Sequence, residues 1–261
     1  ALKLLAKRDN EKLNEIKNVY EWFENNLEII FPSSRIKALA VQIEKDPEFK
    51  QYLEENIKAI DIGIASLRTE TATLDPEKDV DKINKEMFNE ILHDINDNPE
   101  NAIGLRMKNE EIILVKENGE IKTKRLKLLH ENLDRSIEFY LSEESDGTIR
   151  LLDLIPAFMQ LLIEDKIVII DEIERSIHPV LIKELLTKFS KNKKIKGQLI
   201  FTTHESNLLD QKIIRRDEVW FAEKNKEGKT ELYSLDEFKE HKTIDIRKGY
   251  LGGRYGSIPL L

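Results

Sequence analysis

The stretch Ile167-Val168-Ile169-Ile170-Asp171-Glu172 carries most of what the sequence says about the fold. Its four uninterrupted apolar residues predict a strand that is buried on both faces, as in a parallel sheet. Helices are predicted on either side of it, over 149–164 and 179–191, and a second buried strand follows over 199–202. Functional side chains of such sheets collect at the carboxyl ends of the strands. The two carboxylates stand at such an end and are therefore candidate functional residues.

An apolar strand followed by two carboxylates has the form of a Walker B segment. In nucleotide hydrolases the first carboxylate holds Mg²⁺, usually through water, and the second polarises the water that attacks the γ-phosphate. Asp171 and Glu172 stand in these two positions. The alternative is a buried strand that merely leaves the sheet through a charged turn.

A histidine follows the second buried strand. The sequence there reads Thr202-Thr203-His204, with polar residues 205–207 directly behind it. A histidine at the end of such a strand can hydrogen-bond a γ-phosphate oxygen and hold the attacking water. A structural histidine is the alternative, but the Walker B strand about thirty residues upstream favours the functional interpretation.

A polar turn opens the helix that is predicted before the Walker B strand. It reads Ser145-Asp146-Gly147-Thr148. A serine and a glycine at a helix N-terminus offer a phosphate a hydroxyl, main-chain N–H groups and the positive end of the helix dipole. An ordinary capping turn, with Ser145 or Asp146 as the N-cap, is the other interpretation.

Together these tracts resemble the ABC-type ATPase heads of chromosome-maintenance proteins, of overcoming-lysogenization-defect nucleases and of abortive-infection or anti-phage ATP-binding proteins. The last group is the most similar. Residues 145–150 resemble its signature motif, 171–179 its Walker B segment and D-loop, and 201–204 its switch-histidine strand. The tail 250–259 and the segment 19–23 are also similar to it. The resemblance covers about residues 140–261 well and about 10–35 weakly.

The resemblance implies ATP and Mg²⁺ as cofactors and a role for each matched residue. It implies Asp171 as the carboxylate of the Mg²⁺ site, Glu172 as the catalytic base and His204 as the γ-phosphate sensor. Heads of this kind work as head-to-tail dimers with two ATP molecules between the protomers, so each active site is composite. Nucleotide-driven closing and opening of the homodimer would then switch an effector protein.

Four further residues are implied to lie at the nucleotide. Ser145, Gly147 and Thr148 would contact the ATP that is held by the second protomer. His178 stands in the D-loop, where transporter-type heads carry an aspartate. The Ser-Ile-His-Pro form is similar to the nuclease-associated and defence groups, which leaves the hydrogen bonds between protomers open.

The chain contains no Gly-x-x-x-x-Gly-Lys-Ser/Thr loop, which an ATPase of this type needs to cradle the phosphates. The nearest string, Gly228-Lys229-Thr230, is predicted to be a hairpin turn between strands near 218–222 and 231–234. We therefore expect the C-terminal part of a longer ATPase whose phosphate loop lies upstream. The alternative is a degenerate, non-catalytic head that serves as a dimerising scaffold for an effector protein.

The expected fold class is α/β: a P-loop NTPase-like head with a mostly parallel sheet flanked by helices and an inserted helical and β-hairpin region. Residues 141–261 are assigned to the C-terminal lobe of the ATPase head, and residues 1–140 to the helical segments and the insertion. Asn118-Gly119 predicts a hairpin between 103–115 and 121–129, after short extended segments from residue 62. Helices are predicted over 10–30, over 34–44, from 47 onward and over 80–95.

Composition excludes several classes of protein. With no cysteine, the chain has neither a disulfide scaffold nor cysteine-ligated metal, and a cytoplasmic location is expected. The 42 basic and 50 acidic residues give a net charge of −8, which disfavours a dominant nucleic-acid binder but leaves DNA at a local groove open. No apolar run approaches the roughly 20 residues of a membrane span, so no membrane partner is expected.

Overall fold

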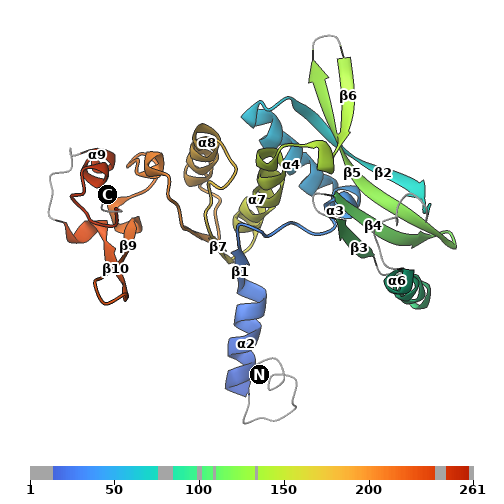
Figure 1. Cartoon of the computed structure of the whole chain (residues 1–261), viewed down its shortest axis with the longest axis horizontal. Helices are drawn as coiled ribbons and strands as arrows, with labels where there is room; N and C mark the ends of the chain where they lie inside the picture. The colour runs from blue at the N-terminus through green and yellow to red at the C-terminus, as the bar shows by residue number, and fades with distance from the viewer. Residues whose placement is uncertain are drawn as a thin grey trace. The chain divides into compact units, whose positions relative to one another are not determined.

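The computed structural model describes residues 14–75, 85–98, 102–107, 110–132, 135–238 and 245–258. None of the helices in these ranges is long and apolar enough to cross a membrane. The helices and strands, in chain order (Figure 1), are α2 (Asn14–Asn26), β1 (Leu27–Ile30), α3 (Leu39–Lys45), α4 (Pro47–Ile60), β2 (Ile64–Thr73), α6 (Lys85–Asp97), β3 (Ile103–Met107), β4 (Glu110–Glu117), β5 (Glu120–Asn132), β6 (Arg135–Tyr140), α7 (Asp146–Ile163), β7 (Ile167–Ile170), α8 (Pro179–Ser190), β8 (Gln198–Phe201), β9 (Trp220–Lys224), β10 (Thr230–Ser234) and α9 (Ile246–Leu251), with short 3₁₀ turns at 141–143, 206–208, 216–218 and 235–237.

The chain forms two compact units. One takes in the described residues up to Pro32 and from Gln160 onward, and the other runs from Ser33 to Met159. The first unit contains the parallel sheet, and the second contains a larger antiparallel sheet. The predicted α/β class is confirmed. The assignment of 1–140 and 141–261 to separate regions was based on motifs rather than contacts, and it stays a prediction.

The parallel sheet has the strand order β1-β7-β8. The predicted strand at 167–170 is confirmed, and β8 begins one residue earlier than predicted. In register, Ile30 and Ile170 are neighbours, and both side chains are buried together with Val168. One face of β7 is therefore buried, through Val168 and Ile170, and its other face is half-buried. The expectation that the next strand is buried is wrong, because β8 contains no buried residue and Ile200 is exposed.

The helix predicted over 10–30 is corrected by the structure. Helix α2 ends at Asn26, and residues Leu27–Ile30 form β1, which pairs in parallel with β7; residues 10–13 lie outside the described part of the chain. Two β-branched residues at the end of β1 suit a strand, and pairing with β7 satisfies their main-chain groups. Tertiary pairing therefore overrides the helical spacing of the apolar residues that precede them.

A glycine allows the chain to enter β8. The N–H groups of Lys196 and Gly197 donate to the Leu161 carbonyl oxygen at 2.9 and 3.0 Å. A Cβ atom at position 197 would lie 2.4 Å from the carbonyl oxygen of Lys166, which no side chain allows. Gly197 is thus the residue that lets the end of α7 and the start of β8 approach so closely.

The antiparallel sheet has the order β2-β5-β4-β3, and β6 also pairs with β5. The predicted hairpin turn is confirmed: Asn118 and Gly119 have φ of 54° and 83° between β4 and β5. The single strand predicted over 103–115 is wrong, because β3 and β4 are two strands whose register pairs Met107 with Glu110. The short segments expected after residue 62 are instead one ten-residue strand, β2.

The helices of this unit follow local signals at their start. Helix α4 begins as predicted at Pro47, and the Asp46 carboxylate accepts a hydrogen bond from the Phe49 N–H at 2.9 Å. Helix α3 is shorter than predicted and begins after Ala38, whose φ is 55°. Helix α6 covers part of the predicted 80–95, of which residues 80–84 lie outside the described ranges. Its residues Phe88 and Ile95 form one buried cluster with Leu105 of β3 and with Ile112 and Leu114 of β4.

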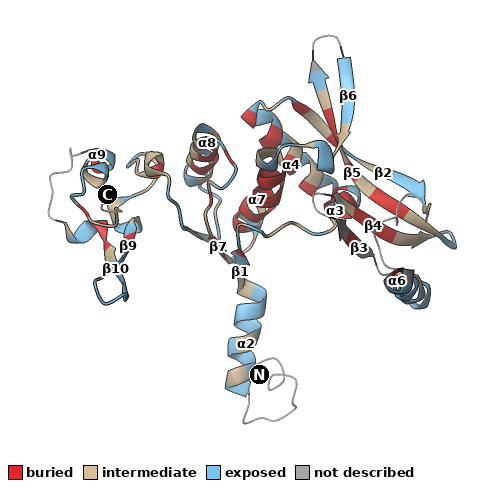
Figure 2. Cartoon of the chain, in the orientation of Figure 1, coloured by how far each residue is buried: buried red, intermediate tan, exposed pale blue. Residues whose placement is uncertain are grey.

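Burial differs sharply between the two longest helices that adjoin the parallel sheet in sequence. Figure 2 shows α7 buried along much of its length and α2 exposed. Helix α7 buries Leu154, Ile155 and Leu161 completely, whereas α2 contains no buried residue. Among the described residues of α2, the large apolar side chains Val19, Trp22 and Phe23 are exposed.

The C-terminal segment forms a small aromatic core. Tyr255 is 1% exposed and stacks on Phe221, with ring centroids 5.6 Å apart. The Tyr233 hydroxyl donates to the Tyr255 carbonyl oxygen at 2.7 Å. The tail that resembled the defence group therefore seats Tyr255 in a core, while Gly228 (φ 79°) lies in the predicted hairpin turn between β9 and β10.

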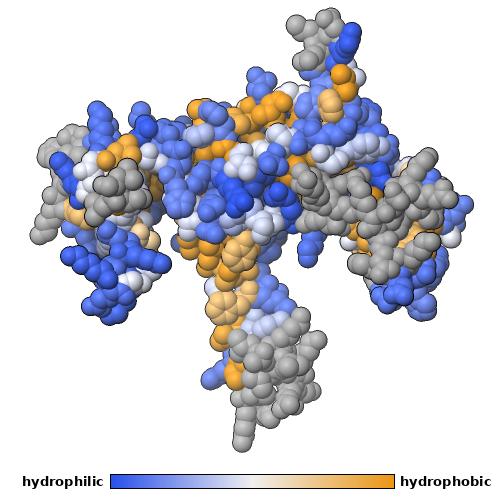
Figure 3. Space-filling view, in the orientation of Figure 1, coloured by the Kyte–Doolittle hydropathy of each residue, from blue (hydrophilic) through white to orange (hydrophobic). Residues whose placement is uncertain are grey.

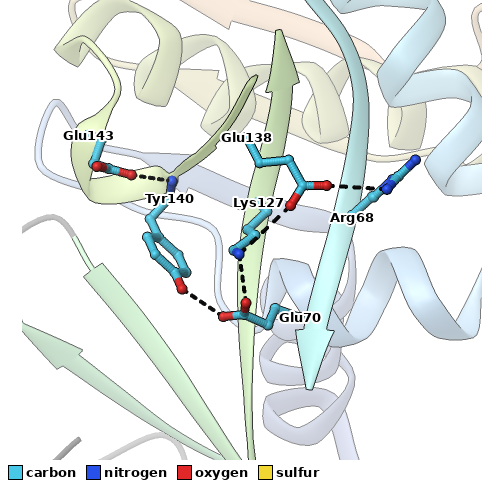
Figure 4. Close-up of polar contacts among 6 residues, drawn as sticks. All are labelled: Arg68, Glu70, Lys127, Glu138, Tyr140 and Glu143. Atoms are coloured by element: carbon cyan, nitrogen blue, oxygen red, sulfur yellow. Dashed lines mark hydrogen bonds and ion pairs between the residues drawn. The ribbon is translucent and has the colours of Figure 1, made fainter. Parts of the chain in front are cut away.

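A charged network joins β2, β5 and β6 (Figure 4). The Lys127 ammonium lies 2.6 Å from Glu70 and 3.7 Å from Glu138, and Glu138 lies 3.2 Å from Arg68. The Tyr140 hydroxyl also donates to Glu70, at 2.8 Å. Chiefly because it accepts a hydrogen bond from Lys127, the Glu70 carboxyl has a pKa below its ordinary value of 4.5.

Replacing Glu70 with glutamine is expected to lower the free energy of unfolding at neutral pH by less than about 1 kcal/mol, because the site is partly exposed. A lowered pKa means that Glu70 stabilises the fold fully above pH 4.5 and loses this effect as the pH falls through the lowered pKa. The difference in the free energy of unfolding between wild type and variant should therefore become smaller in acid. Urea unfolding from pH 7 downward measures it. Glu120→Gln, an exposed change in the same sheet, is the control; a difference that does not depend on pH would contradict the prediction.

Candidate functional site

The two predicted carboxylates stand where β7 leaves the parallel sheet. The Asp171 N–H donates to the Ile30 carbonyl oxygen at 2.9 Å, so Asp171 continues the pairing with β1. One oxygen of the Asp171 carboxylate accepts a hydrogen bond from the Thr202 hydroxyl at 2.6 Å. The same hydroxyl accepts a hydrogen bond from the Glu172 N–H at 2.9 Å. Thr202, directly after β8, thus links both carboxylate residues to the neighbouring strand.

Glu172 has an unusual main-chain conformation. Its φ is 46°, in the left-handed region, where a residue with a Cβ atom costs roughly 1 to 2 kcal/mol. Its side chain is 39% exposed and pairs only loosely with Arg175, at 3.5 Å. Strain of this kind persists where the surroundings impose it, and it is common in active sites. Here the hydrogen bond to Thr202 holds the strained residue, and its carboxylate remains open to a ligand.

His204 is tied to the same edge through its main chain. Its N–H donates to a carboxylate oxygen of Glu174 at 2.8 Å, and the Ile173 N–H donates to the Thr202 carbonyl oxygen at 3.1 Å. The imidazole of His204 is exposed and makes no hydrogen bond to any residue in the described ranges. The structure therefore brings Asp171, Glu172 and His204 together at the carboxyl end of the sheet.

The loop behind His204 is anchored at its far end. The Asp210 carboxylate lies 2.8 Å from the Lys183 ammonium on α8. This contact, together with the Lys212 N–H, holds the pKa of Asp210 below its ordinary value. Nearer the histidine, the Glu205 carboxylate accepts from the Asn207 N–H at 2.9 Å. The loop that follows His204 is thus held by contacts at its near end and at its far end.

The predicted signature turn lies in the other compact unit. Ser145 caps α7: its hydroxyl oxygen accepts from the Thr148 N–H at 3.1 Å and lies 2.9 Å from the Thr148 hydroxyl. Just before it, Glu144 lies 2.6 Å from the His130 ring. The capping interpretation is confirmed, and the contacts of Ser145, Gly147 and Thr148 with a nucleotide stay a prediction.

The predicted D-loop histidine has a structural partner. His178 precedes α8, and its Nδ1 accepts a hydrogen bond from the Val180 N–H at 3.3 Å. Pro179 occupies the first turn of the helix, where its missing N–H costs nothing. The ring of His178 thus serves as a helix cap, and its predicted contact with a nucleotide stays a prediction.

The donors at this edge suit Mg²⁺. Across the described ranges, no three His, Asp or Glu side chains gather into a potential metal cage. Mg²⁺ in nucleotide sites does not need one, because one or two carboxylates, waters and the phosphates complete its shell. Asp171, held by Thr202 beside Glu172, is a donor of that kind.

Two residues of this site carried no role in the sequence analysis. Thr202 was visible only as part of the strand end, and Glu174 only as a member of the D-loop tract. The signal that could have found Thr202 is a hydroxyl at the first position after a strand next to the Walker B strand. For Glu174 the sequence offers no signal beyond its position two residues after Glu172.

Comparison with known families identifies a family for the chain. The family model described as "AAA domain, putative AbiEii toxin, Type IV TA system" matches residues 3–210, well over half of the chain. No curated protein matches the chain. The matched residues include β1, the Walker B strand, α8 and His204. The chain therefore belongs to this AAA domain family, a family of P-loop ATPases related to abortive infection.

Proposed function

We propose that this chain supplies the Walker B and switch-histidine part of an ABC-type ATPase site, which hydrolyses Mg-ATP. The observation that carries the proposal is the Thr202 hydroxyl, which joins Asp171 and Glu172 at the end of the parallel sheet. The site adds an exposed imidazole at His204, and membership of a P-loop ATPase family supports nucleotide binding in general. ATP and Mg²⁺ are the proposed cofactors.

Each residue has a definite task in this proposal. Asp171 would hold Mg²⁺, directly or through water, and the ion would neutralise charge on the β- and γ-phosphates. The Glu172 carboxylate accepts a proton from the attacking water as the water oxygen bonds to the γ-phosphorus. The bond from that phosphorus to the bridging oxygen breaks, and ADP leaves with the electron pair. His204 donates a hydrogen bond to a γ-phosphate oxygen as charge develops there.

The phosphate-binding loop is proposed to come from polypeptide outside these 261 residues, because the chain contains no such motif. Among the described residues β8 has one strand neighbour, β7, so its other edge is available for a parallel strand. The open sheet face carries Ile29 and Ile200, which are 46% and 43% exposed and lie in one row of the register. Figure 3 shows apolar side chains gathered along α2 and at β1. A strand followed by a helix would pair with β8 and cover this face.

A homodimer is proposed to complete the site. Ser145, Gly147 and Thr148 at the start of α7 would contact ATP held by the second protomer, as in the heads that this chain resembles. Their place at the N-terminus of the eighteen-residue helix α7 supports this, because the positive end of the helix dipole attracts a phosphate. Closing of the dimer on ATP and opening after hydrolysis would switch an effector protein in an anti-phage or DNA-maintenance system.

The test is an assay of nucleotide binding and phosphate release on the natural gene product in full, with Mg²⁺ and with EDTA. Mg²⁺-dependent turnover, together with ATP-dependent dimerisation by light scattering, is the expected result. Tight ATP binding without turnover would contradict catalysis. Neither binding nor turnover, with a stable complex to an effector, would favour the non-catalytic scaffold instead.

A further inference from the structure

We propose that Glu174 is a positioning residue that holds the switch histidine against the Walker B turn. Its carboxylate oxygen accepts the hydrogen bond from the His204 N–H at 2.8 Å, across thirty residues of sequence. Through this hydrogen bond, the Glu174 side chain in the turn after β7 contacts His204 itself. The Thr202 side chain instead contacts Asp171 and Glu172. The effect on hydrolysis rests on the proposed function; the effect on His204 does not.

The turn holds Glu174 from both sides. Ile173 is fully buried, and its N–H donates to the Thr202 carbonyl oxygen at 3.1 Å. Ile177 is also buried, and its N–H donates to the Glu174 carbonyl oxygen at 2.9 Å. These contacts fix the main chain on both sides of Glu174, so the turn presents its side chain toward the loop that carries His204.

The position of the Glu174 side chain lowers the stability of the fold. The second carboxylate oxygen of Glu174 is buried and makes no hydrogen bond to any residue that the structure describes. Burial of an unsatisfied polar oxygen is unfavourable, and a neutral amide is cheaper to bury than a carboxylate. A hydrogen bond from a main-chain N–H to a carboxylate is, however, shorter and stronger than one to a neutral oxygen. A carboxylate at position 174 therefore holds His204 more firmly than an amide would, although burying it makes the fold less stable.

Three variants separate positioning from catalysis. Glu174→Ala removes the acceptor, Glu174→Gln keeps an oxygen in the same place without the charge, and Glu184→Ala removes an exposed glutamate of α8 as the matched control. The first measurement is amide hydrogen exchange of His204 by NMR in the 261-residue chain without nucleotide. Exchange about tenfold faster in Glu174→Ala, a smaller increase in Glu174→Gln, whose neutral oxygen still accepts the hydrogen bond, and no change in Glu184→Ala are the expected results.

The second measurement is steady-state hydrolysis by the natural gene product in full. We expect Glu174→Ala to lower kcat by about tenfold with KM little changed, and Glu174→Gln to restore most of it. Unchanged His204 exchange in Glu174→Ala would overturn the proposal, and so would a Glu174→Gln variant that has lost all turnover, since that would make Glu174 catalytic. If the wild type does not hydrolyse ATP, the proposed function fails, and the exchange data still decide the role of Glu174.

Discussion

Replacement of Glu172 by glutamine in the natural gene product is expected to stop ATP turnover while nucleotide binding persists. The amide has nearly the shape of the carboxylate but cannot accept a proton from water, and loss of a general base costs about 10²- to 10⁴-fold in rate. The Glu172 N–H bonds to Thr202 through the main chain, so this contact survives the change. The measurement is kcat from phosphate release, beside the affinity for a fluorescent ATP analogue.

Glu174→Gln provides a matched control for this experiment. It makes the same chemical change two residues away, in the same turn, but at a carboxylate that accepts a main-chain N–H. We expect it to retain most of the turnover that Glu172→Gln loses. Turnover that survives in Glu172→Gln would remove Glu172 as the base and leave its strained conformation without a catalytic explanation.

Replacement of Asp171 by asparagine is expected to weaken Mg²⁺-dependent nucleotide binding by about 10- to 100-fold. An asparagine oxygen can still accept the hydrogen bond from the Thr202 hydroxyl, so the turn should keep its geometry. What is lost is the negative charge that a hard divalent cation needs. The measurement is ATP-analogue affinity titrated against Mg²⁺.

The Mg²⁺ titration also identifies the cause of any loss. Binding measured in EDTA should change little between wild type and Asp171→Asn, because the phosphates then bind without the ion. Asp236→Asn, an exposed change in the turn after β10, controls for the removal of one charge. Equal losses with and without Mg²⁺ would mean that Asp171 supports the fold of the site rather than the metal.

Local patterns predicted the elements whose signals are strong within a few residues. The buried run at 167–170 became β7, Asn118-Gly119 became a hairpin turn, and Asp46 with Pro47 began α4. Each depends on burial or on the conformational preference of one or two residues. Residues 27–30 were predicted wrongly, because their apolar spacing suits a helix and only pairing with β7 makes them a strand.

In the candidate site, too, some residues could be predicted from the sequence and others could not. The sequence alone pointed to Asp171, Glu172 and His204, because a carboxylate pair and a histidine that each follow an apolar strand form a known chemical pattern. It could not assign Thr202 or Glu174 their contacts. A hydroxyl or a carboxylate near a strand end is common, and its partner depends on the register of β7 against β8.

By itself, then, the sequence determined the class of fold, the positions of strands β7 and β8 to within a residue, and the chemical identity of the candidate site. The tertiary structure alone decided that β1 lies beside β7, that Thr202 joins Asp171 to Glu172, and that Glu174 holds His204. The physical reason is range. Burial and turn preferences act between residues that are close in sequence, whereas these hydrogen bonds join residues about thirty positions apart that meet only after parallel strands pair.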